Sequence, residues 1–217
     1  MRKDNGQMYA VNTYEQIEKR EWELNERHII VLLFVRPSLP GADKVIEEFN
    51  YIHHNAGRYC SVYAVGYSDI CDNTAYPDFR PVKGTCQKEW YYSDQAFVDF
   101  KEILERRLKW RYSGEIELLI LQSNPEGKSI LNFDNYLAVD VNYGIRNEYI
   151  ESFPRFMESL IRGSKKEVES VELTKKIRRC RLKEIAFGAI EECKKIPKPV
   201  RSIIKDRLFY KTARSYS

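Results

Sequence analysis

The chain has 217 residues, 43% of them hydrophobic, and its formal net charge is +4. This composition is apolar enough to bury a core, which excludes intrinsic disorder for the chain as a whole. No apolar run reaches the roughly 18 residues of a membrane-spanning helix, and the first residues lack the apolar segment of a secretory signal. We therefore expect a cytoplasmic protein that makes no membrane contact.

The first predicted element is a highly charged helix over residues 12–27. Thr13 stands at its expected N-cap position and Gln16 follows three residues later, which is the spacing of a capping box. Apolar residues such as Tyr14 and Ile17 give the helix a partial stripe. We expect it to lie on the surface against the first strand.

The next segment predicts a strand, a helix and a second strand. Residues 28–35 form an apolar run rich in β-branched side chains, which is typical of a strand buried on both faces. A break containing proline and glycine follows, and residues 42–59 then carry apolar side chains at helical spacing. Residues 60–68 repeat the pattern of a buried strand. This order predicts a β-α-β unit with a right-handed crossover.

A long connection separates this unit from the next helix. Residues 69–93 contain prolines, a glycine and a group of aromatic residues: Tyr76, Phe79, Trp90, Tyr91 and Tyr92. Connections of this length are uncommon inside compact domains and are often functional. We expect an irregular insertion that its aromatic side chains hold against the sheet edge, with Ser93 or Asp94 capping the helix that follows.

The remainder of the expected domain is a helix, two strands and a helix. Residues 94–110 have a helical apolar stripe, residues 116–122 and 136–142 read as two strands of a hairpin, and residues 147–162 read as the last helix. Pro154 should kink this last helix or shift its start.

The order of these elements resembles that of the thioredoxin-like superfamily, in which a β-α-β half and a β-β-α half are joined by a helix. The resemblance covers residues 12–162 and implies a three-layer α/β sandwich. A flavodoxin-type sandwich is the alternative, and it is disfavoured because a turn rather than a helix joins the third and fourth predicted strands.

The residues of the family's redox site are missing. The superfamily places a Cys-x-x-Cys motif just after the central strand, where this chain has Pro37-Ser-Leu-Pro-Gly-Ala42. It also places a cis-proline before the hairpin, where this chain has Ser113-Gly-Glu-Ile116. The resemblance therefore implies the fold without the usual redox activity.

The chain is predicted to end in a basic helical extension. Residues 164–217 contain 16 Lys/Arg and 7 Asp/Glu, so they carry +9, while residues 1–163 carry −5. We expect residues 1–163 to be the thioredoxin-like domain, with the insertion at about 69–93, and helices over 168–193 and 200–210 to form the extension. An acidic body and a basic tail favour self-docking or an acidic partner.

The extension carries an apolar stripe flanked by arginines, which predicts a docking surface. Its expected partner-binding residues are Ile185, Ile203, Ile204, Leu208, Arg178, Arg179 and Arg181. Short isolated helices are marginal in water, so this stripe needs a surface: its own domain, a second copy in a homodimer, or a protein partner. Sequence-nonspecific nucleic-acid binding by the basic residues is a further alternative, less favoured than docking.

Few residues point to chemistry. Asp69, Cys71 and Asp72 follow the second predicted strand at the end where open α/β sheets bind ligands, so they are the best local site candidates, with Cys86 in the same insertion. Adjacent residues of a helix point about 100° apart, so the pair at 53 and 54 (both histidines) cannot easily share a metal ion. No phosphate-binding loop, nucleophile elbow or HExxH motif occurs, and we expect no cofactor and no metal.

These patterns predict a redox-inactive thioredoxin-like interaction or accessory subunit rather than an enzyme. The chain has five cysteines and no Cys-x-x-Cys. A thiol-dependent oxidoreductase that uses Cys71 and Cys86 is the enzymatic alternative, because a cationic neighbour or a helix N-terminus can activate an exposed thiol.

Overall fold

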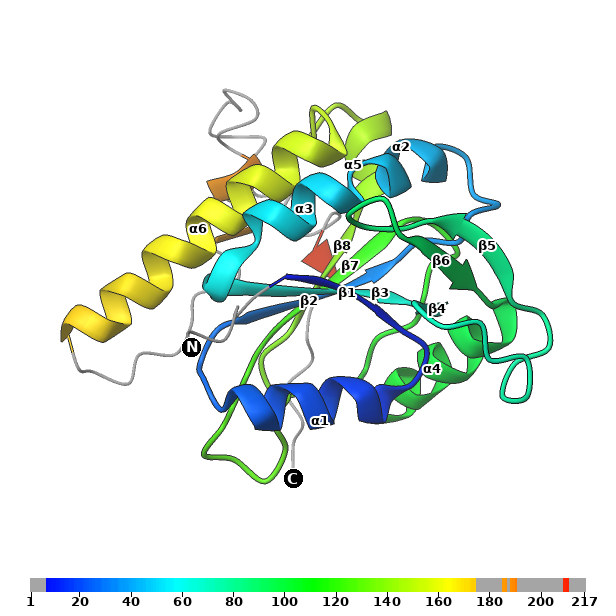
Figure 1. Cartoon of the computed structure of the whole chain (residues 1–217). Coiled ribbons are helices and arrows are strands. Elements are labelled where there is room, and N and C mark those ends of the chain that lie inside the picture. Colours follow the sequence, from blue (N-terminus) through cyan, green and yellow to red (C-terminus); the bar gives the residue numbers. More distant parts are fainter. Residues whose placement is uncertain (1–6, 175–184, 187, 191–208, 211–217) are drawn as a thin grey trace.

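A computed structural model describes residues 7–174, 185–186, 188–190 and 209–210 (Figure 1). These residues form a mixed α/β fold whose centre is a six-stranded sheet. In spatial order the strands are β1 (Met8–Val11), β3 (Cys60–Val65), β2 (Ile29–Phe34), β7 (Glu117–Gln122), β8 (Leu137–Asp140) and β9 (Phe209–Tyr210).

The sheet is parallel on one side and antiparallel on the other. Strands β1, β3 and β2 run parallel, whereas β7 is antiparallel to β2 and β8 is antiparallel to β7. Ile29 therefore lies opposite Cys60 on one side and Gln122 on the other. Every residue of β2 and β3 is buried, which confirms the expectation drawn from their continuous apolar runs.

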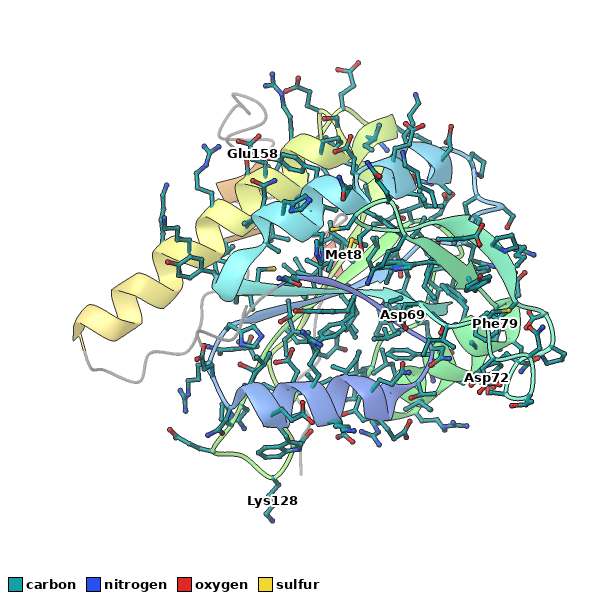
Figure 2. The ribbon with its side chains drawn as sticks, viewed as in Figure 1. Met8, Asp69, Asp72, Phe79, Lys128 and Glu158 are labelled. Carbon is teal, nitrogen blue, oxygen red and sulfur yellow. The ribbon has the colours of Figure 1, made fainter. Side chains whose placement is uncertain are left out.

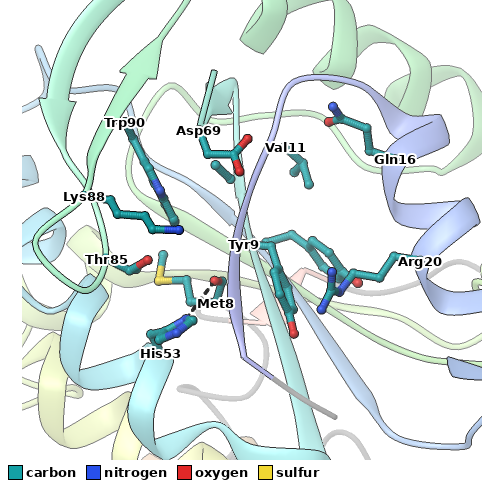
Figure 3. Close-up of a pocket in the computed structure, with 12 residues that line it drawn as sticks. Met8, Tyr9, Val11, Gln16, Arg20, His53, Asp69, Thr85, Lys88 and Trp90 are labelled. Carbon is teal, nitrogen blue, oxygen red and sulfur yellow. Dashed lines mark hydrogen bonds between the residues drawn. The ribbon is translucent and has the colours of Figure 1, made fainter. Parts of the chain in front are cut away.

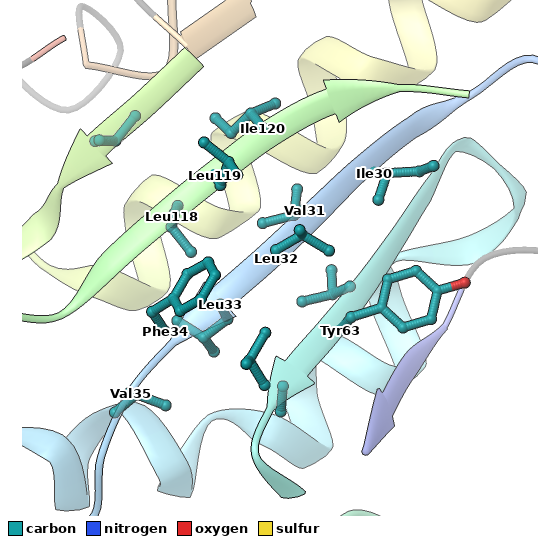
Figure 4. Close-up of a cluster of buried hydrophobic side chains, with 14 of the residues drawn as sticks. Ile30, Val31, Leu32, Leu33, Phe34, Val35, Tyr63, Leu118, Leu119 and Ile120 are labelled. Atoms are coloured by element: carbon teal, nitrogen blue, oxygen red, sulfur yellow. The ribbon is translucent and has the colours of Figure 1, made fainter. Parts of the chain in front are cut away.

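Helices cover both faces of the sheet (Figure 1). One face carries α1 (Tyr14–Leu24) and α4 (Asp94–Arg107), and the other carries α3 (Phe49–Asn55) and α6 (Phe153–Thr174). Successive side chains of β2, β3 and β7 point to opposite faces, so the core has two apolar layers (Figure 4). The shorter helices are α2 (Ala42–Glu47), the 3₁₀ turn η1 (Gly57–Tyr59) and α5 (Val141–Arg146).

The insertion contributes two strands to a second, three-stranded sheet that the sequence did not predict. Strands β4 (Tyr67–Ser68), β6 (Glu89–Tyr92) and β5 (Arg80–Lys83) pair antiparallel, so the expectation of an irregular connection is wrong for part of the segment. Its aromatic side chains do hold it in place, as expected: Trp90 and Tyr92 pack against Tyr67, with ring centroids 6.2 and 5.0 Å apart.

A glycine allows the chain to pass from one sheet into the other. Gly66 lies between β3 and β4 with φ +84°, a conformation that glycine adopts without strain. Its N–H donates to Val11 O at 2.8 Å and its carbonyl accepts from Ser93 N at 3.0 Å. Gly66 therefore links the edge of the main sheet to the start of α4.

Several predicted boundaries are wrong. Strand β1 was not expected, and the helix expected over 42–59 is divided at Glu48 into α2 and α3. Strand β8 ends at Asp140 because this residue caps α5, accepting a hydrogen bond from Tyr143 N at 2.7 Å. The helix expected from 147 begins at Phe153, which places Pro154 in its first turn, where proline is tolerated.

The described part of the extension packs on the body. Helix α6 passes through Gly163 without a break, so no change of secondary structure marks the expected boundary. A Cβ atom on Gly163 would lie 2.9 Å from Ile185 Cγ2, and Ile185 is 9% exposed. Ala186, Ala189 and Ile190 are buried as well. For these residues the apolar stripe is buried within the chain itself, by self-docking.

The other residues expected to bind a partner, Ile203, Ile204, Leu208, Arg178, Arg179 and Arg181, lie outside the described residues. The helix expected to reach residue 210 does not do so, because Phe209–Tyr210 is a strand paired with β8. Among the described residues, no helix has the length and apolarity to cross a membrane.

Candidate functional site

The carboxyl ends of the parallel strands carry a polar cluster instead of thiols. The chain leaves β2 at Val35-Arg36 and turns through residues 37–41 into α2, with Leu39 N donating to Arg36 O at 3.0 Å. Ligands of open α/β sheets bind at this end of the strands. Arg36 is the first charged side chain at this end of β2.

Arg36 forms a two-pronged ion pair with Asp94. Its Nε and Nη2 atoms donate to Asp94 Oδ1 at 3.0 and 2.7 Å. Arg80 Nη2 donates to Asp94 Oδ2 at 3.0 Å, and the Tyr92 hydroxyl donates to Oδ1 at 3.1 Å. Burial opposes the charged form of Asp94, but the arginines and the tyrosine outweigh it and lower the pKa of this carboxyl. Arg36 and Arg80 thus share one carboxylate, that of Asp94.

A second carboxylate fixes the insertion to the same place. Asp78 accepts hydrogen bonds from the Ser93 hydroxyl and, at 3.1 Å, from Gln95 N, at the start of α4. Ser93 is the N-cap of α4, as expected, and accepts from Ala96 N at 2.9 Å. The loop between β4 and β5 is therefore held over the carboxyl end of the sheet. Within the described residues, the cluster therefore sets two carboxylates, Asp78 and Asp94, against two guanidinium groups, and its charges balance.

The predicted site residues Cys71 and Asp72 lie in an exposed turn. Cys71 Sγ donates to Asn73 Oδ1 at 3.4 Å, and Asp72 accepts from Thr74 N at 3.0 Å and from the Thr74 hydroxyl. These bonds from Thr74 lower the pKa of Asp72. Figure 2 shows Asp72 in the outermost loop and Asp69 closer to the sheet. Asp72 thus stabilises its own turn.

Cys86 has a different set of neighbours. It lies exposed in the turn between β5 and β6 with φ +50°, its N–H donates to Asn50 Oδ1 at 2.7 Å, and its Sγ is 3.8 Å from His54 Nε2. Cys71 and Cys86 are both free thiols, so the structure does not join them as a disulfide pair. The described residues contain no group of three potential metal ligands, and the rings of His53 and His54 lie 5.5 Å apart at a steep angle.

Asp69 lines a cavity along β1 (Figure 3). The cavity has a volume of about 270 Å³; strand β1 forms its floor, α1 contributes Gln16 and Arg20, and the β5–β6 hairpin contributes Thr85, Lys88 and Trp90. His53 reaches it from α3 and donates from Nδ1 to Met8 O at 3.1 Å. Of the four predicted site residues, Asp69 alone lines this cavity. The sequence did not predict the other residues that line the cavity, because it did not predict β1, which forms the cavity floor.

A buried polar network lies at the opposite end of β2. His28 Nε2 is 2.9 Å from Ser61 Oγ and 3.0 Å from Glu21 Oε2, and the Tyr63 hydroxyl donates to Glu21 Oε1. Glu21 Oε2 is buried without a hydrogen-bond partner among the described residues, and its attraction to the imidazole is electrostatic.

This network is enclosed. The side chains of His28 and Glu21 are 3% and 0% exposed. Burial disfavours the charged imidazole, but the attraction of Glu21 outweighs it and raises the pKa of His28. A substrate could not reach these groups, so we assign them a structural role.

Comparison of the chain with protein-family models finds no match. Comparison with curated proteins also finds none, and neither does comparison with solved structures.

Proposed function

We propose that the chain is a thioredoxin-like domain without thiol-disulfide oxidoreductase activity, acting as an interaction or accessory subunit in the cytoplasm. The order β2–α2–α3–β3, then α4, then β7–β8–α6 supports the fold, because it has a β-α-β half and a β-β-α half joined by a helix. The two halves meet where β2 pairs with β7.

The observation that carries the loss of redox activity is the turn after β2, which has no thiol and begins with the Arg36–Asp94 pair. In the superfamily the reactive thiols follow the central strand; in this chain that place holds Pro37-Ser-Leu-Pro-Gly-Ala42, directly after an arginine bonded to Asp94 at 2.7 Å. Cys60 is buried at the start of β3, at the other end of the parallel strands, where burial raises the pKa of its thiol to about 12. The described cysteines are free, which fits a reducing compartment.

An insulin-reduction assay with a dithiol tests this proposal. The intact chain should not accelerate the reaction above the dithiol alone. A matched variant, Pro37→Cys with Pro40→Cys, restores the family's motif at its place and reports whether that position still supports exchange. Turnover by the intact chain would contradict the proposal, and its loss in Cys71→Ser or Cys86→Ser would assign it to those thiols.

The enzymatic alternative depends on the Cys86–His54 contact. An imidazole 3.8 Å from a thiol can take its proton and activate it. Iodoacetamide labelling of the intact chain and of His54→Gln decides this question. We would abandon the alternative if Cys86 in the intact chain reacts no faster than the thiol of a short peptide.

The partner is proposed to be a protein or a second copy of the chain. Nucleic-acid binding by the basic extension is the alternative, and it predicts affinity that falls steeply between about 50 and 200 mM salt. Filter binding over this range separates the two, since no binding at the low end removes the nucleic-acid alternative.

A further inference from the structure

Strand β1 is an edge strand whose outward backbone groups can be assigned. Val62 N donates to Gln7 O at 3.0 Å and Gly66 N donates to Val11 O at 2.8 Å, so the backbone groups of residues 7, 9 and 11 face β3. Backbone groups alternate in direction along a strand. Met8 and Ala10 therefore present their N–H and C=O groups away from the sheet.

One of these outward groups is already satisfied. Met8 O accepts from His53 Nδ1 at 3.1 Å, which also confirms the direction in which Met8 faces. Within the described residues, β1 pairs with β3 alone, and no hydrogen bond joins the N–H or C=O of Ala10 to another strand. The N–H and C=O of Ala10 are therefore available to pair with an added strand.

The cavity along this edge is cationic. Lys88 is exposed and makes no ion pair within the described part of the chain. Arg20 lies over the Tyr9 ring at 3.3 Å, and its Nε is buried without a hydrogen-bond partner among the described residues. Figure 3 shows Lys88 on one side of β1 and Arg20 on the other, with Asp69 nearer the Val11 end. Acidic side chains would therefore be attracted to both sides of an added strand.

Resting on the interaction role proposed above, we propose that the outer edge of β1 binds an extended acidic segment of a partner protein by strand addition. Main-chain hydrogen bonds to Ala10 give the affinity, and Lys88 and Arg20 select acidic residues on the incoming segment. A second copy fits less well, because a two-fold axis through β1 would bring these cations toward their own counterparts.

The probe is a short fluorescent peptide of alternating Glu and Val, measured by anisotropy against the full chain. It is compared with the same peptide carrying Lys in place of Glu, and with one that is N-methylated at alternate residues. The acidic probe should bind, with an affinity that falls as salt rises, and both altered peptides should bind at least about tenfold more weakly.

Two variants of the chain place the binding on β1. Ala10→Pro removes an outward N–H that the β1–β3 ladder does not use, so the fold should be kept, as a circular dichroism melt checks. Lys88→Glu reverses a charge in the cavity along β1, and Lys83→Glu makes the same change at a lysine of the same β5–β6 hairpin that does not line this cavity. Ala10→Pro and Lys88→Glu should each weaken the acidic probe about fivefold to tenfold, and Lys83→Glu should leave it unchanged.

The outcomes separate this inference from the proposed function. No binding of the acidic probe, equal binding of the N-methylated peptide, or equal effects of the two lysine variants would each overturn strand addition at β1. A dimer in light scattering that Ala10→Pro dissociates would also overturn it, because the occupant would be a second copy. None of these results bears on the insulin assay, which tests redox inactivity alone.

Discussion

Replacing Glu21 by glutamine should destabilise the protein in a pH-dependent way. Glutamine keeps the shape of the side chain and can still accept the hydroxyl of Tyr63, so the main loss is the negative charge 3.0 Å from His28. Both side chains are almost completely buried. Removing one partner of a buried ion pair costs about 3–5 kcal/mol, because the other charge is left without compensation.

The sign of the pH dependence follows from the raised pKa of His28. A histidine whose folded pKa lies above its unfolded value of 6.5 adds stability that is fully present below pH 6.5 and is lost as pH rises through the folded pKa. Each pKa unit is worth about 1.4 kcal/mol. In Glu21→Gln, burial acts on His28 without the opposing carboxylate. The free energy of unfolding should therefore drop most in mild acid and less in alkali.

Urea unfolding of the intact chain and of Glu21→Gln at pH 5.5 and 8.5 measures this difference. Glu15→Gln makes the same chemical change on the exposed side of α1 and should alter stability little at either pH. An equal loss for Glu21→Gln at the two pH values would refute the reasoning, because it would show that the charge of His28 does not contribute.

Four other substitutions have clear expected outcomes. Burial raises the pKa of Glu117 from 4.5 to about 7, so the free energy of unfolding falls as pH rises through this range. Glu117→Gln should therefore gain up to about 3 kcal/mol of stability at pH 8.5, measured by urea unfolding. A loss of stability at this pH would contradict the assignment. Gly66→Ala places a Cβ 2.7 Å from Phe97 Cβ at φ +84° and should cost about 3 kcal/mol in thermal unfolding. Gly114→Ala, at φ +91° and with nothing within 4 Å among the described residues, should cost only the backbone strain of about 1–2 kcal/mol; equal losses would disprove a steric cause at position 66. Asp94→Asn should cost about 1 kcal/mol of stability, since the Asp94 side chain is a third exposed and solvent screens its ion pairs. Because the pKa of Asp94 is lowered, the stability difference between the intact chain and the variant should be present above pH 3.8 and vanish in stronger acid. A stability difference that does not change with pH would argue against the ion pairs.

The sequence predicted the elements whose stability is mainly local. The capping box of α1 is present, with Gln16 Oε1 accepting from Thr13 N at 3.3 Å, and Ser93 caps α4 as expected. Strands β2 and β3 were found because both of their faces are buried, which leaves a continuous apolar run. The two-strand pairing of β7 with β8 was found because a turn sequence lies between two apolar runs.

The missed elements depend on contacts between distant parts of the chain. Strand β1 has four residues, too few for a pattern, and it is defined by its pairing with β3. Strand β5 contains Pro81, and a proline in a sequence normally indicates the end of a strand. In the small sheet β5 is an edge strand, where proline is tolerated.

The candidate site residues also divide into those that the sequence could predict and those that depend on tertiary packing. Asp69 was found from the general rule that ligands meet open sheets at the carboxyl ends of strands, and it lines the cavity along β1. Lys88 and Arg20 could not be placed beside it, since they come from a hairpin and a helix whose relation to β1 is set by tertiary packing. The Arg36–Asp94 pair joins residues 58 positions apart, and no local pattern links them.

The central position of β7 has a consequence for the rate at which this protein folds. Ile29 pairs with Gln122 and Leu33 with Leu118, so the middle of the sheet cannot close until most of the chain has been synthesised. Until then, one edge of β2 and the face that α6 later covers remain open to other chains. Pairings between residues so distant in sequence slow folding, and exposed strand edges promote aggregation. We expect refolding to be slower than that of a helical protein of similar length and to depend on chain concentration, as stopped-flow fluorescence at several concentrations would measure.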